Sequence, residues 1–311
     1  MSLSIQSRSG RELLRLSLRE PGAPQTVDDL QQLLWLQGPR VKPLRQRLTL
    51  PTGVASAPKA RSLLEAGHKL EEYGIRVDAG AQDFVVHFKD LGPQVSWRGV
   101  FLAEYLGPLV LFPIVFTLQL GGLDFSYAWH RALPQQRAAL VAWTLHFAKR
   151  ELETLFVHRF SNATMPWRNL VKNCAYYWGF ATYVAYFVCH PRYTPVASHI
   201  QFWIGVLCFG IGELGNLVCH WRLRQLRPAG TRLRQIPYGF LFELVSCPNY
   251  TFEVLAWVGF NLMTQTIAGI LFMLVGTLQM MIWAQAKHRQ YLKEFGTLYP
   301  RSRKRMFPFI W

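Results

Sequence analysis

Hydrophobic residues are unevenly distributed along this chain of 311 residues. Up to about residue 95, apolar and polar residues alternate over short stretches. From Gly99 onward, apolar runs of about 20 residues recur, the length that a helix needs to cross the roughly 30 Å hydrocarbon core of a bilayer. We identify six such segments, at 99–119, 138–157, 170–189, 197–219, 239–261 and 266–286. The pattern predicts an all-α polytopic membrane bundle of about six transmembrane helices over residues 93–311, preceded by a small domain over residues 1–92.

The N-terminal 92 residues carry the signals of a mixed α+β domain. Ser2–Gln6 and Glu12–Ser17 alternate apolar and polar side chains around a turn at Arg8-Ser-Gly10, as in a β-hairpin. Thr26-Val-Asp-Asp29 forms a weak capping box that opens a helix at Val27–Leu36. Further short strands are expected at Arg45–Leu50, Gly74–Val77 and Asp83–Phe88. This order predicts a ubiquitin-like, β-grasp domain, either a docking or regulatory module or a plain structural extension, because it contains no catalytic constellation.

Charge gives the bundle an orientation. The chain has 34 Lys+Arg against 18 Asp+Glu, a net charge of +16, although 50% of its residues are hydrophobic and only 17% are charged. Basic residues gather after the second and fourth apolar segments and in the C-terminal tail, whereas the other loops contain few or none. They are Arg159, Arg168, Lys172, Arg222, Arg224, Arg227, Arg232, Arg234, Lys287, Arg289, Lys293, Arg301, Arg303, Lys304 and Arg305. By the positive-inside rule, both termini are expected in the cytosol.

The composition also limits the classes of binding partner that the protein can have. An aromatic content of 14% excludes intrinsic disorder. A net charge of +16 suggests an anionic partner, either nucleic acid or a phosphate-bearing group at a membrane. The segments Arg222–Arg234 and Lys287–Arg305 directly flank predicted spans, which favours membrane lipids or a phosphate-bearing ligand and no nucleic acid. The five cysteines lie in or beside apolar segments without a CxxC pair, so we expect neither a disulfide framework nor a metal site.

One motif has the spelling of a dinucleotide-binding turn. Gly210-Ile-Gly-Glu-Leu-Gly215 matches GxGxxG, but that fingerprint requires a strand before the glycines and a helix starting at them. Here the motif lies inside a predicted membrane helix. Close packing of helices through small residues is therefore the better interpretation.

Ionisable residues inside membrane helices are costly and suggest function. Glu104 lies in the first span, and Lys149 and Glu153 lie four residues apart in the second, where they can pair on one helical face. Further polar residues occupy the fourth and fifth spans: Glu213, Asn216, Glu243, Asn249, Tyr250 and Glu253. Pro248 is expected to break the fifth helix in mid-span. Any one of these residues could simply form an interhelical pair or snorkel; together they predict a polar chamber inside the bundle.

Three segments of the chain resemble a known family. Lys149-Arg-Glu-Leu-Glu-Thr-Leu-Phe-Val-His-Arg-Phe-Ser161, Val245-Ser-Cys-Pro-Asn-Tyr-Thr-Phe-Glu253 and Pro308-Phe-Ile310 are similar to the very-long-chain trans-2-enoyl-CoA reductases of the steroid 5α-reductase superfamily. The resemblance covers nearly the whole chain, including the ubiquitin-like N-terminal domain.

The resemblance implies an activity and catalytic residues. The expected reaction is NADPH-dependent reduction of the trans-2 double bond of a long- or very-long-chain enoyl-CoA, the last step of fatty-acid elongation in the endoplasmic reticulum membrane. Other elongation enzymes are possible partners. Tyr250 matches the family's proton-donating tyrosine. Lys149 is expected to strengthen that acid or polarise the thioester, and Glu104 to orient the network.

The same resemblance implies a cofactor site. The superfamily pattern is present from Asn216 to Leu223-Arg-Gln-Leu-Arg227. It implies an NADPH pocket lined by Asn216, Arg227, Asn249, Tyr291 and Arg303, where arginine forks would suit the phosphates. The neighbourhood of Ile236-Pro237 differs from that of steroid-reducing relatives, which leaves the contacts of this loop open.

Other functions remain open at this point. The nearest alternative is a reductase of the same superfamily acting on a steroid or polyprenoid enone. A membrane isoprenylcysteine methyltransferase has a similar helical core, but the pattern from Asn216 to Arg227 argues against it. A non-catalytic membrane scaffold would not require a tyrosine, a lysine and a carboxylate inside the bundle.

Overall fold

The computed structural model describes residues 2–51, 63–76, 83–160, 162–228 and 234–311. The chain divides into two compact units, Met1–Val95 with Thr164–Trp167, and Ser96–Ala163 with Arg168–Trp311. Each unit has its own buried core.

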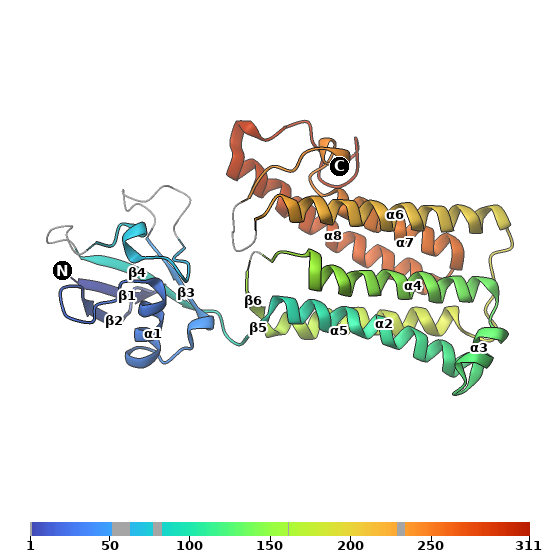
Figure 1. Ribbon diagram of the computed structural model, residues 1–311, viewed down its shortest axis with the longest axis horizontal. Helices are drawn as coiled ribbons and strands as arrows, with labels where there is room; N and C mark the ends of the chain where they lie inside the picture. Colours follow the sequence, from blue (N-terminus) through green and yellow to red (C-terminus); the bar gives the residue numbers. More distant parts are fainter. Residues whose placement is uncertain (1, 52–62, 77–82, 161, 229–233) are drawn as a thin grey trace. The chain divides into compact units, whose positions relative to one another are not determined.

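The first unit is a mixed sheet with one α-helix. Its sheet has the order β2-β1-β4-β3 (Figure 1), in which β1 is antiparallel to β2 and parallel to β4, and β3 is antiparallel to β4. The elements are β1 Ser2–Ser7, β2 Glu12–Ser17, α1 Val27–Gln37, β3 Gln46–Thr49 and β4 Phe84–Asp90, with 3₁₀ helices η1 Pro43–Arg45 and η2 Leu70–Tyr73. The predicted hairpin, the helix and the strands near residues 45–50 and 83–88 are confirmed.

The predicted capping box of α1 is also present. The Thr26 hydroxyl accepts a hydrogen bond from the Asp29 N–H at 3.2 Å, and the Asp29 carboxylate accepts one from the Thr26 N–H at 2.9 Å. These bonds from Thr26 hold the pKa of Asp29 below its ordinary value. Because this pKa is lower in the folded state than in the unfolded state, the ionised carboxylate stabilises the folded domain at pH values above the pKa of the unfolded state. That contribution is lost as the pH falls through the pKa of the folded state.

The predicted strand at Gly74–Val77 is wrong for the residues described. Residues 74–76 form no strand, and Val77 lies outside the described residues. Gly74 instead ends η2 in a left-handed conformation with φ 81°, which glycine adopts without strain. A short pairing of β5 Gln94–Ser96 with β6 Thr164–Pro166 has no counterpart in the sequence prediction.

The second unit consists of helices that lie side by side (Figure 1). They are α2 Trp97–Gly121, α3 Phe125–Arg131, α4 Pro134–Leu152, α5 Trp167–Val188, α6 His199–Gln225, α7 Pro248–Thr264 and α8 Ile267–Phe295. Shorter pieces are the π-helix η3 Glu153–Val157 and the 3₁₀ helices η4 Phe240–Glu243 and η5 Gly296–Leu298. The short helix α3 was not predicted from the sequence. Aromatic rings fill the interior, where Trp143 contacts Phe112 and Trp257 at centroid distances of 5.0 and 5.4 Å.

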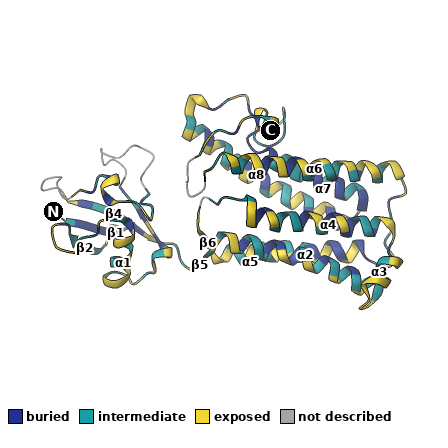
Figure 2. Ribbon diagram, in the orientation of Figure 1, coloured by how far each residue is buried: buried dark blue, intermediate teal, exposed yellow. Residues whose placement is uncertain are grey.

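Among the described residues, three helices are long and apolar enough to cross a membrane: α2, α6 and the helical stretch Ile267–Leu298 that contains α8. Their large apolar side chains remain exposed at helical spacing, as in Leu106, Val110, Ile114 and Leu118 of α2. Figure 2 shows exposed residues recurring along α6 as well. Such surfaces fit lipid contact. The other three predicted spans coincide with α4, α5 and α7, which do not reach the same length and hydropathy.

The sequence led us to expect that Pro248 breaks a helix in mid-span, and this prediction is wrong. Pro248 is the first residue of α7, where its missing N–H has no helical acceptor to lose. Residues 240–243 form the separate η4 turn. The polar segment 245–250 is therefore the entry of a helix.

Two glycines of the GxGxxG motif lie against α7, which confirms the packing interpretation. A Cβ atom at Gly212 would lie 2.5 Å from the backbone nitrogen of Ala256, and one at Gly215 would lie 2.3 Å from the ring of Phe252. Gly210 meets nothing within 4 Å. Small residues therefore allow α6 and α7 to approach closely.

We expect Gly212→Ala and Gly215→Ala to destabilise the second unit by about 1–3 kcal/mol each, because overpacking a close contact forces backbone or ring shifts. Gly210→Ala is the matched control and should be neutral or slightly stabilising, since alanine is the better helix former. Thermal unfolding in detergent measures the difference, and equal melting temperatures for all three variants would contradict it.

Candidate functional site

Five polar side chains from three helices form a closed ring in the second unit. His146 and Lys149 of α4 each contact Glu213 of α6, His146 Nδ1 to Oε1 at 2.7 Å and Lys149 Nζ to Oε2 at 2.8 Å. His146 Nε2 also lies 3.4 Å from Oε1 of Glu253 on α7. Asn216 of α6 closes the ring between Glu253 and Lys149. The spacing 146/149 on α4 and 213/216 on α6 places each pair on one helical face.

Asn216 is the residue through which this ring reaches α7. Its Oδ1 accepts from Lys149 Nζ at 2.9 Å, and its Nδ2 donates both to Glu253 Oε2 and to the backbone carbonyl of Asn249, each at 3.0 Å. The residue is 2% exposed. Because Asn249 precedes Tyr250, Asn216 fixes the turn from which Tyr250 projects.

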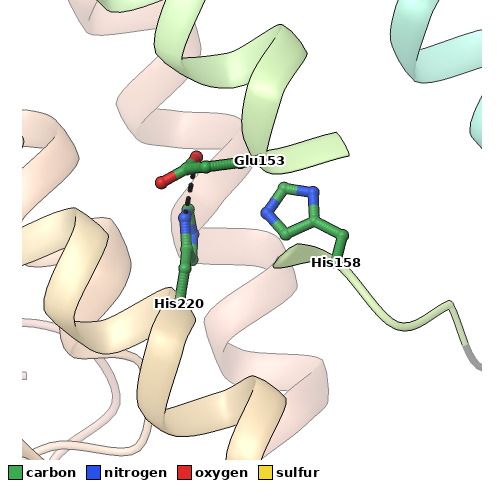
Figure 3. A group of neighbouring side chains, drawn as sticks. All are labelled: Glu153, His158 and His220. Carbon is green, nitrogen blue, oxygen red and sulfur yellow. Dashed lines mark ion pairs between the residues drawn. The ribbon is translucent and has the colours of Figure 1, made fainter. Parts of the chain in front are cut away.

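A second charged cluster lies where α4 ends. The guanidinium of Arg150 donates to Glu153 Oε2 at 2.8 Å and to the hydroxyl of Tyr105 at 2.9 Å. Figure 3 shows Glu153 from α4's end, His220 of α6 and His158 converging, with His220 Nδ1 3.0 Å from Glu153 Oε2. Their possible ligand atoms lie within 4.8 Å of one another. Since the same carboxylate oxygen already accepts from Arg150, charge pairing explains this group.

The backbone at this cluster is irregular. Glu153–Val157 form a π-helix, with the His158 N–H donating to the Glu153 carbonyl at 2.7 Å. Single π turns occur frequently at functional sites. Just beyond it, the side chains of Arg159 and Arg227 each donate to the other's backbone carbonyl. The predicted cofactor residue Arg227 is thus tied to the segment that follows α4.

A pocket of about 310 Å³ opens beside the first turn of α7. It is lined by Leu223, Ser246, Cys247, Asn249, Tyr250, Trp283, Ala286, Lys287 and Tyr291. Three residues predicted from sequence, Asn249, Tyr250 and Tyr291, therefore share one pocket. Among its described lining residues, Lys287 is the one with a full charge, and its ammonium lies 5.5 Å from the ring centre of Tyr291. The pocket is suited to an anionic ligand.

Arg303 is connected to this pocket through stacked aromatic rings. Its guanidinium lies over Tyr299, whose ring stacks on Tyr291 at a centroid distance of 5.2 Å. The Tyr299 hydroxyl shares a 2.7 Å hydrogen bond with Ser246 at the pocket wall. Arg303 donates to the Pro237 carbonyl, and its Nη2 lies 3.7 Å from Glu243 Oε2, but its buried Nε and Nη2 make no hydrogen bond to the described residues. Unsatisfied buried donors of this kind fit a phosphate-bearing ligand.

The C-terminal segment pairs with two residues of the pocket wall. The N–H groups of Ser246 and Cys247 donate to the carbonyls of Lys304 and Arg305 at 2.9 and 3.0 Å. The carbonyl of Trp311 in turn accepts from the N–H groups of residues 305, 306 and 307. The backbone of residues 304 and 305 thus holds the part of the wall that precedes Tyr250.

The predicted site residues fall into separate groups. Glu104 is 2% exposed and accepts a 2.7 Å hydrogen bond from Asn173 of α5, without a recorded contact to the other predicted residues. Lys149 belongs to the ring and reaches Tyr250 only through Asn216 and the backbone. The Lys149–Glu153 pair expected from their spacing is present at 4.0 Å, longer than the Lys149–Glu213 contact.

Two residues of this site were not singled out from sequence. His146 occupies the same face of α4 as Lys149, one turn earlier, and that spacing was its only signal. Lys287 was counted only among the basic residues of the tail, whereas it lies on α8 inside the pocket. Its position could have been found from the Lys287/Tyr291 spacing of one helical turn.

Comparisons with known proteins agree with this architecture. The family model described as 3-oxo-5-alpha-steroid 4-dehydrogenase matches residues 163–311. The very-long-chain enoyl-CoA reductase of Dictyostelium discoideum is 47% identical over 268 residues, which cover 86% of each chain. The probable very-long-chain enoyl-CoA reductase of Caenorhabditis elegans is 48% identical over 263 residues, covering 81% of this chain and 82% of the relative.

A human protein named trans-2,3-enoyl-CoA reductase-like is 35% identical over 294 residues, covering 92% of this chain and 77% of its own. Relatives of this similarity and coverage define an enzyme family of reductases. The chain belongs to the very-long-chain enoyl-CoA reductase family.

We expect Asn216→Leu to destabilise the second unit by about 2–4 kcal/mol, because it leaves the Lys149 ammonium, a Glu253 oxygen and the Asn249 carbonyl without their partner. Gln201→Leu is the matched control, since Gln201 makes a single hydrogen bond from α6 to the Leu262 carbonyl of α7. Chemical unfolding in detergent checks the difference; an Asn216→Leu effect no larger than that of the control would refute the role of Asn216.

Proposed function

We propose that this protein reduces the trans-2 double bond of long- and very-long-chain enoyl-CoA with NADPH, giving the saturated acyl-CoA in the last step of fatty-acid elongation. Membership of the enoyl-CoA reductase family carries the proposal. The pocket beside Tyr250 supports it, because its lining combines the hydroxyls of Ser246, Tyr250 and Tyr291 with one cation, Lys287, and no carboxylate among the described residues.

Tyr250 acts as the acid in this proposal. Reduction of a conjugated thioester at C3 leaves an enolate that requires a hydrogen-bond donor and then a proton at C2. The Tyr250 ring lines the pocket beside Trp283, and its hydroxyl makes no hydrogen bond to another described residue. A hydroxyl without a competing protein acceptor is available to a substrate oxygen or carbon.

Lys149 and Glu104 support the acid in this proposal. Lys149 acts through Asn216, whose bond to the Asn249 carbonyl holds the turn that presents Tyr250. Its positive charge, close to the first turn of α7, also favours the negative charge that develops on the enolate. Glu104, held by Asn173, would order the α2–α5 side of the polar interior.

The cofactor residues are proposed as a set. NADPH bound here would supply the hydride that adds to C3. Asn216, Arg227, Asn249, Tyr291 and Arg303 would hold it, with Lys287 as an additional cation. The unsatisfied guanidinium atoms of Arg303 and the absence of a carboxylate from the described pocket lining are compatible with its phosphates.

We further propose that the protein is a multi-pass protein of the endoplasmic reticulum membrane with both termini in the cytosol. In this arrangement α4, α5 and α7 complete a bundle of six spans around α2, α6 and α8. The N-terminal unit is proposed to be a ubiquitin-like β-grasp domain, which its strand order and single α-helix support. Elongation enzymes that make or use the same acyl-CoA would be its natural partners.

We expect Tyr250→Phe to lower kcat by about 100-fold or more, the scale of a lost general acid, with NADPH binding retained. The measurement follows NADPH absorbance with a long-chain trans-2-enoyl-CoA and purified protein in detergent. Tyr183→Phe, an exposed tyrosine on α5, is the control and should match the wild type.

Turnover of a steroid or polyprenoid enone, but not of enoyl-CoA, would replace the proposed substrate with that class. Consumption of neither substrate by the folded wild type would favour a non-catalytic scaffold. Full activity of Tyr250→Phe would remove Tyr250 as the acid.

We expect Lys287→Met to raise the KM for NADPH or for enoyl-CoA by about tenfold, because one charge-assisted hydrogen bond to a phosphate contributes about 1.5–3 kcal/mol. Separate titrations of the two substrates show which one it contacts. Lys293→Met, an exposed lysine less than two turns further along α8, serves as the control. Unchanged KM values for both substrates would exclude Lys287 from phosphate binding.

A further inference from the structure

His146 lies between two carboxylates inside the second unit. Its Nδ1 is 2.7 Å from Glu213 Oε1, its Nε2 is 3.4 Å from Glu253 Oε1, and its side chain is 3% exposed. The Trp257 ring packs against the imidazole at a centroid distance of 4.7 Å, and its Nε1 donates to the same Glu253 oxygen. Both ring nitrogens of His146 therefore face carboxylate oxygens.

Charge balance identifies the form of His146 that fits this position. The groups that face it are Glu213 from α6 and Glu253 from α7, and Lys149 shares the Glu213 carboxylate from α4 itself. With a neutral imidazole the ring would contain two negative charges and one positive charge. An uncompensated charge in a sequestered site costs several kcal/mol. An imidazolium makes the ring neutral and offers an N–H to each carboxylate.

We propose that His146 is a positioning residue whose imidazolium, placed between the Glu213 and Glu253 carboxylates, neutralises the ring and thereby holds Asn216 on the Asn249 carbonyl. The Glu253 carboxylate contacts both His146 and Asn216. A charged imidazole balances this carboxylate, whereas a neutral one leaves its negative charge to attract other donors. Without that charge, Lys149 has to serve both carboxylates, and its bond to Asn216 is weakened. The turn that carries Tyr250 is then released.

This inference rests on the proposed function only for its kinetic readout. The structural readout is the exchange of backbone amides in the first turn of α7, which requires no substrate. His146→Gln keeps a polar side chain of similar length but removes the charge. His146→Gln/Glu213→Gln restores a neutral ring in which Lys149 balances Glu253 and the two glutamine amides can bond to each other.

For His146→Gln we expect kcat to fall about tenfold, corresponding to about 1.4 kcal/mol, with the KM for NADPH changed by less than about twofold. Amide exchange in peptides covering residues 247–256 should accelerate, by about tenfold. The double variant should recover both quantities to within about threefold of wild type, a non-additivity that only coupled sites show. His199→Gln, at the exposed start of α6, is the control.

Wild-type behaviour of His146→Gln in both measurements would overturn the proposal. So would a double variant that is as impaired as the sum of its single variants, because His146 would then act by shape and not by charge. If His146→Gln does not fold, the folded yield on size-exclusion chromatography becomes the readout, and recovery in the double variant is the expected result. If the wild type does not reduce enoyl-CoA, the proposed function fails, and amide exchange alone decides the role of His146.

Discussion

The second unit depends on a ring of charged and hydrogen-bonded side chains joining α4, α6 and α7. Two carboxylates in a sequestered interior would repel each other and lose their hydration, at a cost of several kcal/mol for each ion. The Lys149 ammonium and the Asn216 amide offset that cost by occupying specific oxygens, so the helices can pack only in the register that makes these contacts. The close approach of α6 and α7 at Gly212 and Gly215 requires the same register. Backbone contact and charge pairing thus specify one arrangement.

Lipid contact explains why this polar interior coexists with a hydrophobic exterior. The helices expose leucine and isoleucine along their outer faces, where a bilayer would be the solvent. Charges inside the bundle can find their counter-charge on another helix, as Lys149 of α4 does in Glu213 of α6. In the pocket, by contrast, the described lining contains the Lys287 cation and no carboxylate, which leaves that charge available to a ligand.

Hydrophobic periodicity and turn chemistry in the sequence were sufficient to predict most helices and strands. The Thr26 capping box and the helix starts near Trp97 and His199 follow from local rules, which is why they were predicted correctly. Pro248 was misread because an apolar run across residues 239–261 hides the change from η4 to α7, and proline is equally compatible with breaking a helix and with starting one.

The site was harder to predict than the fold. Tyr250, Asn249 and Tyr291 were found because a family motif carries them, and the structure brings them into one pocket. His146 was missed because its role depends on Glu213 and Glu253, which are distant in sequence and meet it only after three helices have packed. A spacing rule identifies residues that share a helix face, but it does not identify the carboxylate on the opposite helix.

The pairing of Ser246 and Cys247 with Lys304 and Arg305 has a consequence for biosynthesis. Two residues of the pocket wall have backbone partners at residues 304 and 305, which leave the ribosome after helices α2 to α8 have been made. The helices can therefore enter the membrane and pack before these hydrogen bonds form. A chain that lacks residues 304–311 would form a bundle that is inserted and folded in its core, yet leaves Ser246 and Cys247 without these partners. Quality control that inspects only membrane insertion would not distinguish such a product from the intact protein.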